Sequence, residues 1–175
     1  MALLTDEARQ MVGVTSDWIY ASEPVDRSAI RRFAQAVMDD NPIYWSDSAA
    51  TAAGYTAVVA PPLYPLHALR RPGGVGDPLE AARKSADYDG AGDATARFGL
   101  PKLPIPCVRL LNGGNTLDIF SLATVGDLIR CQSRYLSIEE KEGRSGAFIV
   151  SILESQYQTS DGRRLLNGKQ VHIWR

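Results

Sequence analysis

The last third of the chain limits its fold most, because it is a succession of strand-like segments separated by turn residues. We expect strands over residues 108–111, 117–123, 127–138, 147–159 and 165–174. The intervening segments 112–115, 139–146 and 160–163 contain glycine beside asparagine, aspartate or other polar residues, which is typical of hairpin turns. Short turns of this kind pair consecutive strands antiparallel. An antiparallel meander is therefore expected in this part of the protein.

The first third of the chain has a helical pattern instead. After a short strand over 18–21, Asp26 is the expected N-cap of a helix that Asn41-Pro42 ends, since the residue before a proline is pushed out of the α region. One apolar stripe of this helix is formed by Ile30, Phe33, Ala34, Val37 and Met38. A second helix is expected over 46–53, closed by Gly54, and a third from Leu63 towards Arg71. Helices followed by a meander indicate an α+β domain.

The length of 175 residues fits a single domain spanning 1–175. Between about 72 and 106 the pattern weakens, because glycines, prolines and alternating charges recur there. We interpret this stretch as a long insertion in the domain. A surface loop without a role in binding is the alternative interpretation of the same residues.

Composition and charge narrow the classes of partner. The formal net charge is −1, so no overall field attracts nucleic acid or an anionic membrane surface. The sequence shows neither a basic segment followed by an apolar run near its start nor about 18 consecutive apolar residues, so we expect a cytoplasmic protein without a membrane span. His67 and His172 are the two histidines and have no Cys/His ligand spacing, so a metal site is not expected.

The segment Asp39-Asp40-Asn41-Pro42-Ile43-Tyr44 carries the clearest chemical signal. It nearly spells D-x-N-P-x-H, a pattern in which an aspartate and a histidine jointly hold a water. Here tyrosine stands at the last position. A neutral imidazole accepts a proton near neutral pH, whereas a phenol with an ordinary pKa of about 10 is protonated there and is a poor general base. The dyad is therefore incomplete.

Three local patterns in sequence order carry a resemblance to a known family. They are Asp39 to Tyr44, then Val59-Ala60-Pro61-Pro62-Leu63-Tyr64, and finally Leu111-Asn112-Gly113-Gly114 followed by Val125-Gly126-Asp127. In these features the chain resembles the N-terminal, non-catalytic type of half found in the MaoC-like, or FAS1-like, dehydratases and hydratases. The resemblance implies a hotdog fold, in which a curved antiparallel sheet wraps around a central helix.

The resemblance also implies a chemistry that can be compared with these residues. In active relatives an aspartate and a histidine activate water, and a backbone N–H at the start of the central helix polarises the carbonyl of an acyl thioester. Asp39 and Tyr44 stand at the dyad positions, where the phenol donates but does not readily accept a proton. If Pro61-Pro62 aligns with the start of the central helix, Pro62 has no N–H to donate. Both deficits favour a half that is not itself catalytic.

By the same resemblance, the missing chemistry comes from a second hotdog domain. We expect a separate catalytic hotdog subunit carrying D-x-N-P-x-H, joined edge to edge in a dimer or a dimer of heterodimers. The ligand would be an acyl-CoA or acyl-carrier-protein thioester, and no other cofactor is expected. The insertion lies where relatives that accept bulky acyl groups have a shortened central helix. Long acyl chains and steroid side-chain thioesters both remain open.

Several residues can be interpreted either as substrate-binding residues or as structural residues. The candidates for substrate binding are Asn41, Pro62, Tyr64, His67, Asn112 and Gly113. Asp39 is either a remnant of the dyad or a carboxylate that accepts backbone N–H groups of its loop, and Asn41 also suits the latter role. Tyr44 and His67 are either ligand-facing or packing residues. The glycines after Asn112 suit a turn, or a bulge that lets a ligand approach.

Three functions are compatible with the sequence. The first is a non-catalytic, substrate-shaping subunit of a heteromeric enoyl-thioester hydratase or (3R)-hydroxyacyl dehydratase. The second is a self-sufficient homodimeric hydratase that uses Asp39 together with Tyr44. The third is an acyl-thioester binding module. The activity of the isolated chain separates the second function from the other two.

Overall fold

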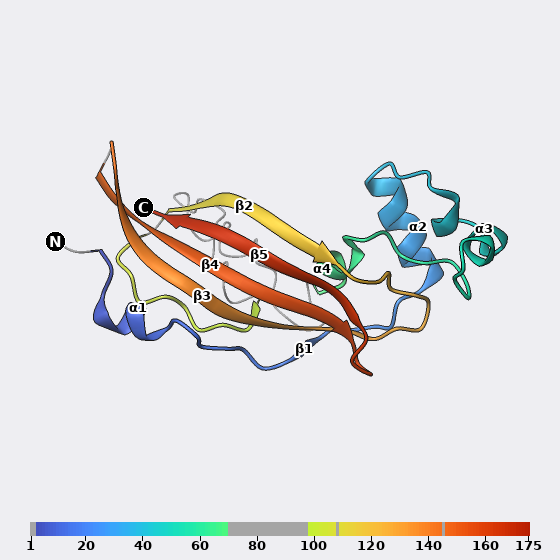
Figure 1. Ribbon diagram of the computed structural model, residues 1–175, viewed down its shortest axis with the longest axis horizontal. Helices are drawn as coiled ribbons and strands as arrows, with labels where there is room; N and C mark the ends of the chain where they lie inside the picture. Colours follow the sequence, from blue (N-terminus) through green and yellow to red (C-terminus); the bar gives the residue numbers. More distant parts are fainter. Residues whose placement is uncertain (1–2, 70–97, 108, 145) are drawn as a thin grey trace, which may run out of the picture.

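A computed structural model describes residues 3–69, 98–107, 109–144 and 146–175. A long, curved sheet occupies most of the molecule, and the helices α2 and α3 lie at one end of it (Figure 1). The helices are α1 (Asp6–Gln10), α2 (Arg27–Ala36), the 3-10 helix η1 (Pro42–Tyr44), α3 (Asp47–Ala52) and α4 (Tyr64–Ala68). The strands are β1 (Ile19–Tyr20), β2 (Leu110–Ile119), β3 (Ile129–Gly143), β4 (Gly146–Thr159) and β5 (Arg164–Trp174).

The five strands form one antiparallel sheet in the order β1-β3-β4-β5-β2. The expected meander is confirmed for β3, β4 and β5, which are consecutive in sequence and adjacent in the sheet. The β4–β5 turn contains the Asp161-Gly162 pair, and Gly162 has a φ of 96°, which glycine adopts without a steric penalty. In the described part of the chain, β1 and β2 are the edge strands.

Helix α2 begins where the sequence predicts and ends earlier. The carboxylate of Asp26 accepts hydrogen bonds from the N–H groups of Ser28 (2.7 Å) and Ala29 (3.0 Å), which caps the helix. The apolar stripe was expected to continue to Met38, but Met38 is 90% exposed and has a φ of 54°. The N–H of Met38 bonds the carbonyl of Gln35, and the next N–H bonds that of Ala34. These two bonds close a Schellman motif with Met38 in the left-handed conformation. The helix therefore ends before the chain reaches Asn41-Pro42.

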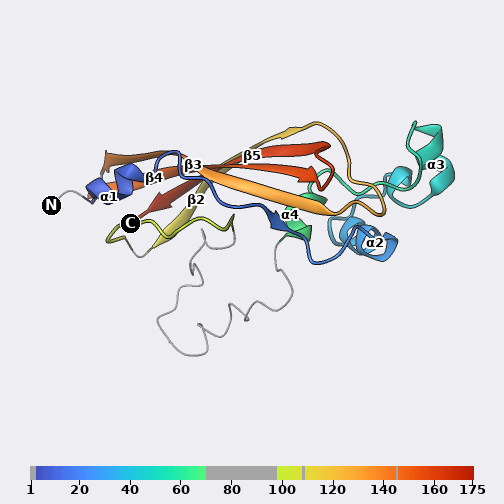
Figure 2. The same ribbon diagram turned by 90° about the horizontal axis from the view of Figure 1, so that it is seen from below.

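Helices α3 and α4 lie where the sequence predicts them. Ser46 caps α3 through Ala49 N–H (3.4 Å), and Gly54 follows the helix with a φ of 90°. Helix α4 is the helix expected from Leu63, and the structure describes one five-residue segment of it. This helix lies on one side of the sheet (Figure 2). The expected Arg71 end of the helix lies outside the described residues.

Two clusters of buried side chains hold the sheet to its surroundings. The first lies at the α2 end and includes Ile30, Tyr44 and Tyr64 together with residues of β3, β4 and β5. The second lies at the opposite end and includes Phe98, Leu100 and Leu103 from the stretch expected to be an insertion. Phe98, Leu100 and Leu103 thus contribute to the core. Residues 72–97 of that stretch lie outside the described residues.

The Asn112-Gly113-Gly114 segment is not a turn, which corrects the expected pair of strands flanking it. Strand β2 runs through it, with a register shift between Asn112 and Gly114 against β5. A Cβ built on Gly113 would lie 2.7 Å from Val171 Cγ1, so glycine lets the two strands approach. Pairing with β5 outweighs the turn preference of the local sequence.

The charged segment 139–146 is also mostly strand, where a loop was expected. Strand β3 extends to Gly143 and β4 begins at Gly146, so the hairpin is tighter than predicted. Glu139 pairs in register with Val150 and Lys141 with Phe148, while Lys141 Nζ lies 3.3 Å from Glu139 Oε2. Charged side chains are accommodated because Glu139 and Lys141 are exposed. None of the helices described is long and apolar enough to cross a membrane.

Candidate functional site

The Asp39–Tyr44 segment is a loop shaped by its own side chains. Asp39 Oδ1 accepts the N–H of Asn41 at 3.1 Å, and Asn41 Oδ1 accepts the N–H of Ile43 at 3.3 Å. Trp45 Nε1 donates to the carbonyl oxygen of Asp39 at 3.2 Å. Side-chain to backbone bonds of this kind fix turns and helix starts. Asp39 and Asn41 therefore both have a structural role in the loop.

Tyr44 is buried at the end of this loop, within the core cluster that also contains Tyr64. Burial raises the pKa of the Tyr44 phenol above its ordinary value, and the negative charge of Asp39 and the proximity of Tyr55 raise that pKa further. The negative charge of the half-buried Asp39 therefore acts on the Tyr44 phenol. The phenol remains protonated at neutral pH, where it can donate a hydrogen bond but cannot serve as the base.

The segment that leads into α4 is held by backbone hydrogen bonds, one of which reaches the connection between β2 and β3. The N–H of Ala60 donates to the carbonyl of Ala123 at 2.8 Å, and the N–H of Tyr64 donates to the carbonyl of Pro61 at 2.9 Å. Pro62 lies between these anchors and has no N–H. Because proline has no backbone N–H, position 62 cannot present a hydrogen-bond donor at the start of α4.

An aromatic group connects α2 with α4. The ring centroids of Phe33 and Tyr64 are 5.6 Å apart in an edge-to-face arrangement, and that of His67 lies 5.4 Å from Phe33. Burial raises the pKa of the Tyr64 phenol, and Asp26 adds a smaller effect in the same direction. His67 is exposed on α4, so its imidazole packs beside Phe33 while remaining accessible.

A cavity of about 590 Å³ lies between α4 and the sheet. This volume falls within the range typical of sites for small molecules. The helical side and its neighbours supply Phe33, Leu63, Leu66, His67, Leu69 and Phe98. The strands supply Ile19, Asn115, Leu117, Cys131, Ser155, Tyr157, Gly168, Lys169 and Gln170. Most of these side chains are apolar, so the cavity suits an apolar group.

The predicted substrate-binding residues are only partly brought together. His67 lines the cavity, whereas Asn41, Pro62, Tyr64, Asn112 and Gly113 are not among its lining residues. Asn112 Oδ1 instead accepts the N–H of Gly114 at 3.0 Å and stabilises the bulge of β2.

Sequence reasoning missed several residues of the strands that line this cavity. Asn115, Ser155 and Gln170 are polar positions on β2, β4 and β5 whose side chains reach it. Alternation along each strand was the available signal. This alternation identifies which residues share a face of the sheet, but it does not identify which face contacts α4.

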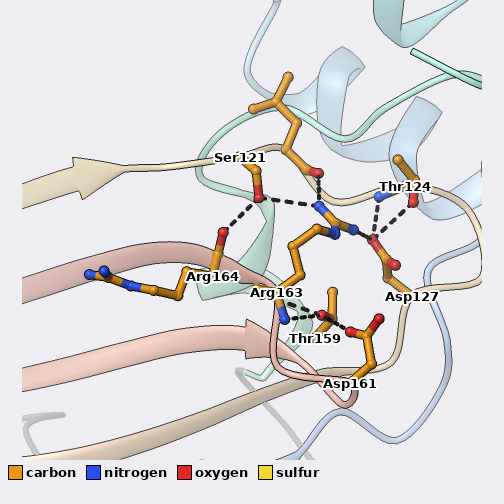
Figure 3. Close-up of polar contacts among 8 residues, drawn as sticks. Ser121, Thr124, Asp127, Thr159, Asp161, Arg163 and Arg164 are labelled. Atoms are coloured by element: carbon orange, nitrogen blue, oxygen red, sulfur yellow. Dashed lines mark hydrogen bonds and ion pairs between the residues drawn. The ribbon is translucent and has the colours of Figure 1, made fainter.

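The last part of the third family pattern, Val125-Gly126-Asp127, joins two loops (Figure 3). Asp127 Oδ2 accepts hydrogen bonds from Thr124 N (2.6 Å) and Thr124 Oγ1 (3.0 Å), and it also pairs with Arg163. The same guanidinium donates to Ser121 Oγ (3.2 Å) and to the carbonyl oxygen of Leu122 (2.8 Å). The connection between β2 and β3 is thereby locked to the turn between β4 and β5. This part of the pattern has a structural role.

The described residues contain no group of three or more His, Cys, Asp or Glu side chains arranged to hold a metal ion. In that part of the chain the cavity and the aromatic group beside it form one candidate site, and the Asp39–Tyr44 loop is a separate feature whose residues do not line the cavity. Hydrogen-bond donors and apolar surface are present in these residues. Asp39 supplies the acid of the D-x-N-P-x-H pattern, and Tyr44 stands at its last position.

Comparisons with known proteins identify relatives over most of the chain. The family model for the FAS1-like, dehydratase domain region matches residues 10–167. A UPF0336 protein of Thermobifida fusca is 28% identical over 151 residues, which is 86% of this chain and 83% of that protein. The 3-oxo-4,17-pregnadiene-20-carboxyl-CoA hydratase alpha subunit of Mycobacterium tuberculosis is 48% identical over 42 residues, covering 24% of this chain and 14% of that protein.

Solved structures share the fold. A chain of the ChsH1-ChsH2 complex of Mycobacterium tuberculosis superposes with a TM-score of 0.69 at 21% identity, over 96% of this chain and 88% of that one. A chain of the HadBC (3R-hydroxyacyl-ACP dehydratase) complex of the same organism gives 0.59 at 18% identity, over 98% and 99%. These similarities confirm the predicted hotdog fold. The family match and the fold together show that this chain belongs to the FAS1-like dehydratase domain family of MaoC-like hotdog proteins.

Proposed function

We propose that this chain is a non-catalytic, substrate-shaping subunit of a heteromeric enoyl-thioester hydratase or (3R)-hydroxyacyl dehydratase, acting on an acyl-CoA or acyl-carrier-protein thioester. The observation that carries the proposal is the buried Tyr44 beside Asp39, because the pKa of this phenol is raised at the position where the family has a base. Adding water to an enoyl thioester requires removal of a proton from that water. This chain holds the carboxylate and lacks the imidazole.

The covalent structure of Pro62 supports the same proposal independently. Stabilising the enolate-like oxygen of the transition state requires a preorganised donor, and removal of one such donor typically costs about 10²–10³ in rate. A proline supplies no N–H. A chain that lacks both the base and this donor gains hydratase activity most simply from a companion that has them.

The edge strand β2 supports assembly with such a companion. It is ten residues long, exposed along nearly all its length, and the sheet of the described residues ends there. Leu111 and Ile119 are about half exposed on it. Long edge strands with free backbone groups are sites of strand addition. Two of the solved structures with this fold are complexes of two different subunits, so we place the catalytic hotdog subunit against β2.

The experiment is purification of the tagged chain from its source cells, with identification of the protein that coelutes. A hotdog subunit with an intact D-x-N-P-x-H is expected, and amide exchange of β2 should slow in the complex, because added strands protect N–H groups. Exchange of the hairpin end near Gly143 is the internal control and should not change. Purification as a homodimer with no hotdog companion would contradict the proposal.

A second candidate is a homodimeric hydratase that uses Asp39 as the base and Tyr44 as the donor. The structure favours it in one respect, since the charge of Asp39 influences the Tyr44 phenol. Asp39, however, already accepts the Asn41 N–H within its loop. A binding module for acyl thioesters, the third candidate, is favoured by the cavity alone. The activity measurements below separate these candidates.

A further inference from the structure

The face of the sheet opposite α4 carries apolar side chains that no described element covers. Helix α4 lies on one side of the sheet (Figure 2), and the odd-numbered residues of β4 from 149 to 159 are buried towards that side. The even-numbered residues of β4 therefore point the other way. The apolar side chains on this opposite face are Phe148, Val150, Ile152, Val171 and Ile173. Within the described residues, none of them belongs to a buried cluster or packs against one.

The pairing of β4 with β5 arranges this face in four rows. From the β3–β4 hairpin inwards, the rows are Phe148 beside Arg175, Val150 with Ile173, Ile152 with Val171, and Glu154 with Lys169. Because two residues rise about 6.8 Å along a strand, the four rows span roughly 20 Å. The two middle rows are apolar, and each outer row joins a cation to a group that attracts cations.

This arrangement is complementary to itself. When two copies pack face to face about a twofold axis that runs along the strands between β4 and β5, β4 of one copy lies over β5 of the other. Each row then meets the same row of the second copy with its two members exchanged. The middle rows lie nearest the centre of the contact, where the usual angle between packed sheets displaces them least.

The exchange brings attractive groups together in every row. Glu154 meets Lys169 of the second copy, and Lys169 meets Glu154 of that copy. In the row nearest the hairpin, Phe148 meets the Arg175 guanidinium of the second copy, which is a cation–π contact. The two middle rows meet as apolar surface against apolar surface. A twofold contact requires a surface that matches itself in this way.

The charged row retains the capacity for such a contact. Glu154 Oε2 lies 2.6 Å from Arg134 Nη2, whereas Glu154 Oε1 lies 3.9 Å from Lys169 Nζ. The second distance is an ion pair and is too long for a hydrogen bond. The Lys169 side chain is 52% exposed. Its ammonium can therefore donate to a carboxylate of a second copy, and Glu154 Oε1 can accept from one.

We infer that this face binds a second copy of the chain through a twofold contact between the β4–β5 pairs. The contact leaves the edge of β2 free for the companion, so the assembly is a dimer of heterodimers. The footprint of four rows on two strands is about 200 Å² per chain, well below the roughly 800 Å² per partner of a stable interface. The isolated chain is therefore expected to dimerise weakly and reversibly. The inference goes beyond the proposed function and does not depend on the catalytic role.

Sedimentation velocity of the purified chain at rising concentration tests the inference, with a reversible monomer–dimer equilibrium as the expected result. Glu154→Lys and Lys169→Glu each place like charges in both exchanged pairs, so each should raise the dissociation constant at least about tenfold. An equimolar mixture of the two variants should dimerise again, because the lysines of one variant then face the glutamates of the other. A variant that had merely lost its fold would not regain dimerisation on mixing.

Asp118→Lys is the matched control, because it changes the charge by the same amount on the exposed edge strand β2. It should leave dimerisation unchanged. A chain that stays monomeric up to about 1 mM, or a mixture that dimerises no better than its components, overturns the inference and leaves the subunit proposal standing. Dimerisation that Asp118→Lys weakens and the two reversals do not also overturns it, since the contact then lies on β2. Hydration of enoyl thioesters by the chain alone overturns the subunit proposal and leaves the twofold contact intact.

Discussion

The negative charge of Asp39 acts on the buried phenol of Tyr44 and, together with burial, raises the pKa of that phenol. The two residues stand at the first and last positions of the Asp39–Tyr44 loop, and Tyr44 is the last residue of the 3-10 helix η1. In a dyad the same proximity would raise the proton affinity of an imidazole and improve it as a base. In a phenol, the nearby negative charge only makes the bound proton harder to remove.

Neutralising Asp39 should therefore lower the pKa of Tyr44. In Asp39→Asn the electrostatic contribution is lost and burial remains, so this pKa should fall while staying above the ordinary tyrosine value. The measurement is phenolate absorbance as pH rises, taken as the difference between each protein and its Tyr44→Phe counterpart. Asp40→Asn, one residue further along the loop, is the control. An unchanged Tyr44 titration in Asp39→Asn would show that the two side chains are not coupled.

Restoring both missing groups should create slow hydration that exceeds the hydration obtained with either change alone. Tyr44→His supplies an imidazole beside Asp39, and Pro62→Gly supplies a backbone N–H at the start of α4. The double variant is expected to hydrate an enoyl-CoA measurably, followed as loss of enoyl absorbance, with each single variant at least about tenfold slower. Adding Asp39→Ala to the double variant should remove the gain. A gain that survives this third change would refute the assigned positions.

The Arg163–Asp127 pair should stabilise the fold more than an exposed pair does. Arg163→Met leaves the Asp127 carboxylate with Thr124 alone and removes the donors to Ser121 and Leu122, which should cost about 1–2 kcal/mol. The control is Lys141→Met, which breaks an exposed pair with Glu139 and should stay within about 0.5 kcal/mol. Urea unfolding measures both. Equal effects would mean that the loop connection contributes nothing beyond a surface ion pair.

A methyl group at Gly113 should clash with β5. The built Cβ lies 2.7 Å from Val171 Cγ1, so Gly113→Ala is expected to destabilise the protein by about 1–3 kcal/mol, as overpacking does. Combining it with Val171→Ala should restore part of that loss, whereas Val171→Ala alone should be mildly destabilising. Strictly additive effects of the two substitutions in thermal unfolding would contradict a direct contact.

Local signals in the sequence were sufficient for the capped helices. Asp26 and Ser46 begin α2 and α3 because their side chains accept backbone N–H groups within the next turn, and this information is contained in a few neighbouring residues. The end of α2 was missed, because a left-handed methionine at position 38 is unfavourable by propensity. The ending is closed instead by the bonds from the N–H groups of Met38 and Asp39 to the carbonyls of Gln35 and Ala34.

The sheet and the cavity depend on contacts between distant segments, which local patterns do not specify. Asn112-Gly113-Gly114 has the composition of a turn, yet pairing with β5 extends β2 through it as a bulge. The pairing of Asn115 with Gln170 depends on the register of β2 against β5, which that bulge shifts. The family resemblance supplied the fold and the Asp39–Tyr44 loop. The strand side of the cavity required the structure.

The most direct test of the account is hydration of an enoyl-CoA by this chain alone and together with its catalytic hotdog companion. We predict no hydration by the chain alone, activity of the reconstituted pair, and retention of that activity in Tyr44→Phe, because the proton is removed by the histidine of the companion. Mutation of that histidine should abolish it. Hydration by the isolated chain that is lost in Asp39→Ala would contradict the account and establish a self-sufficient enzyme.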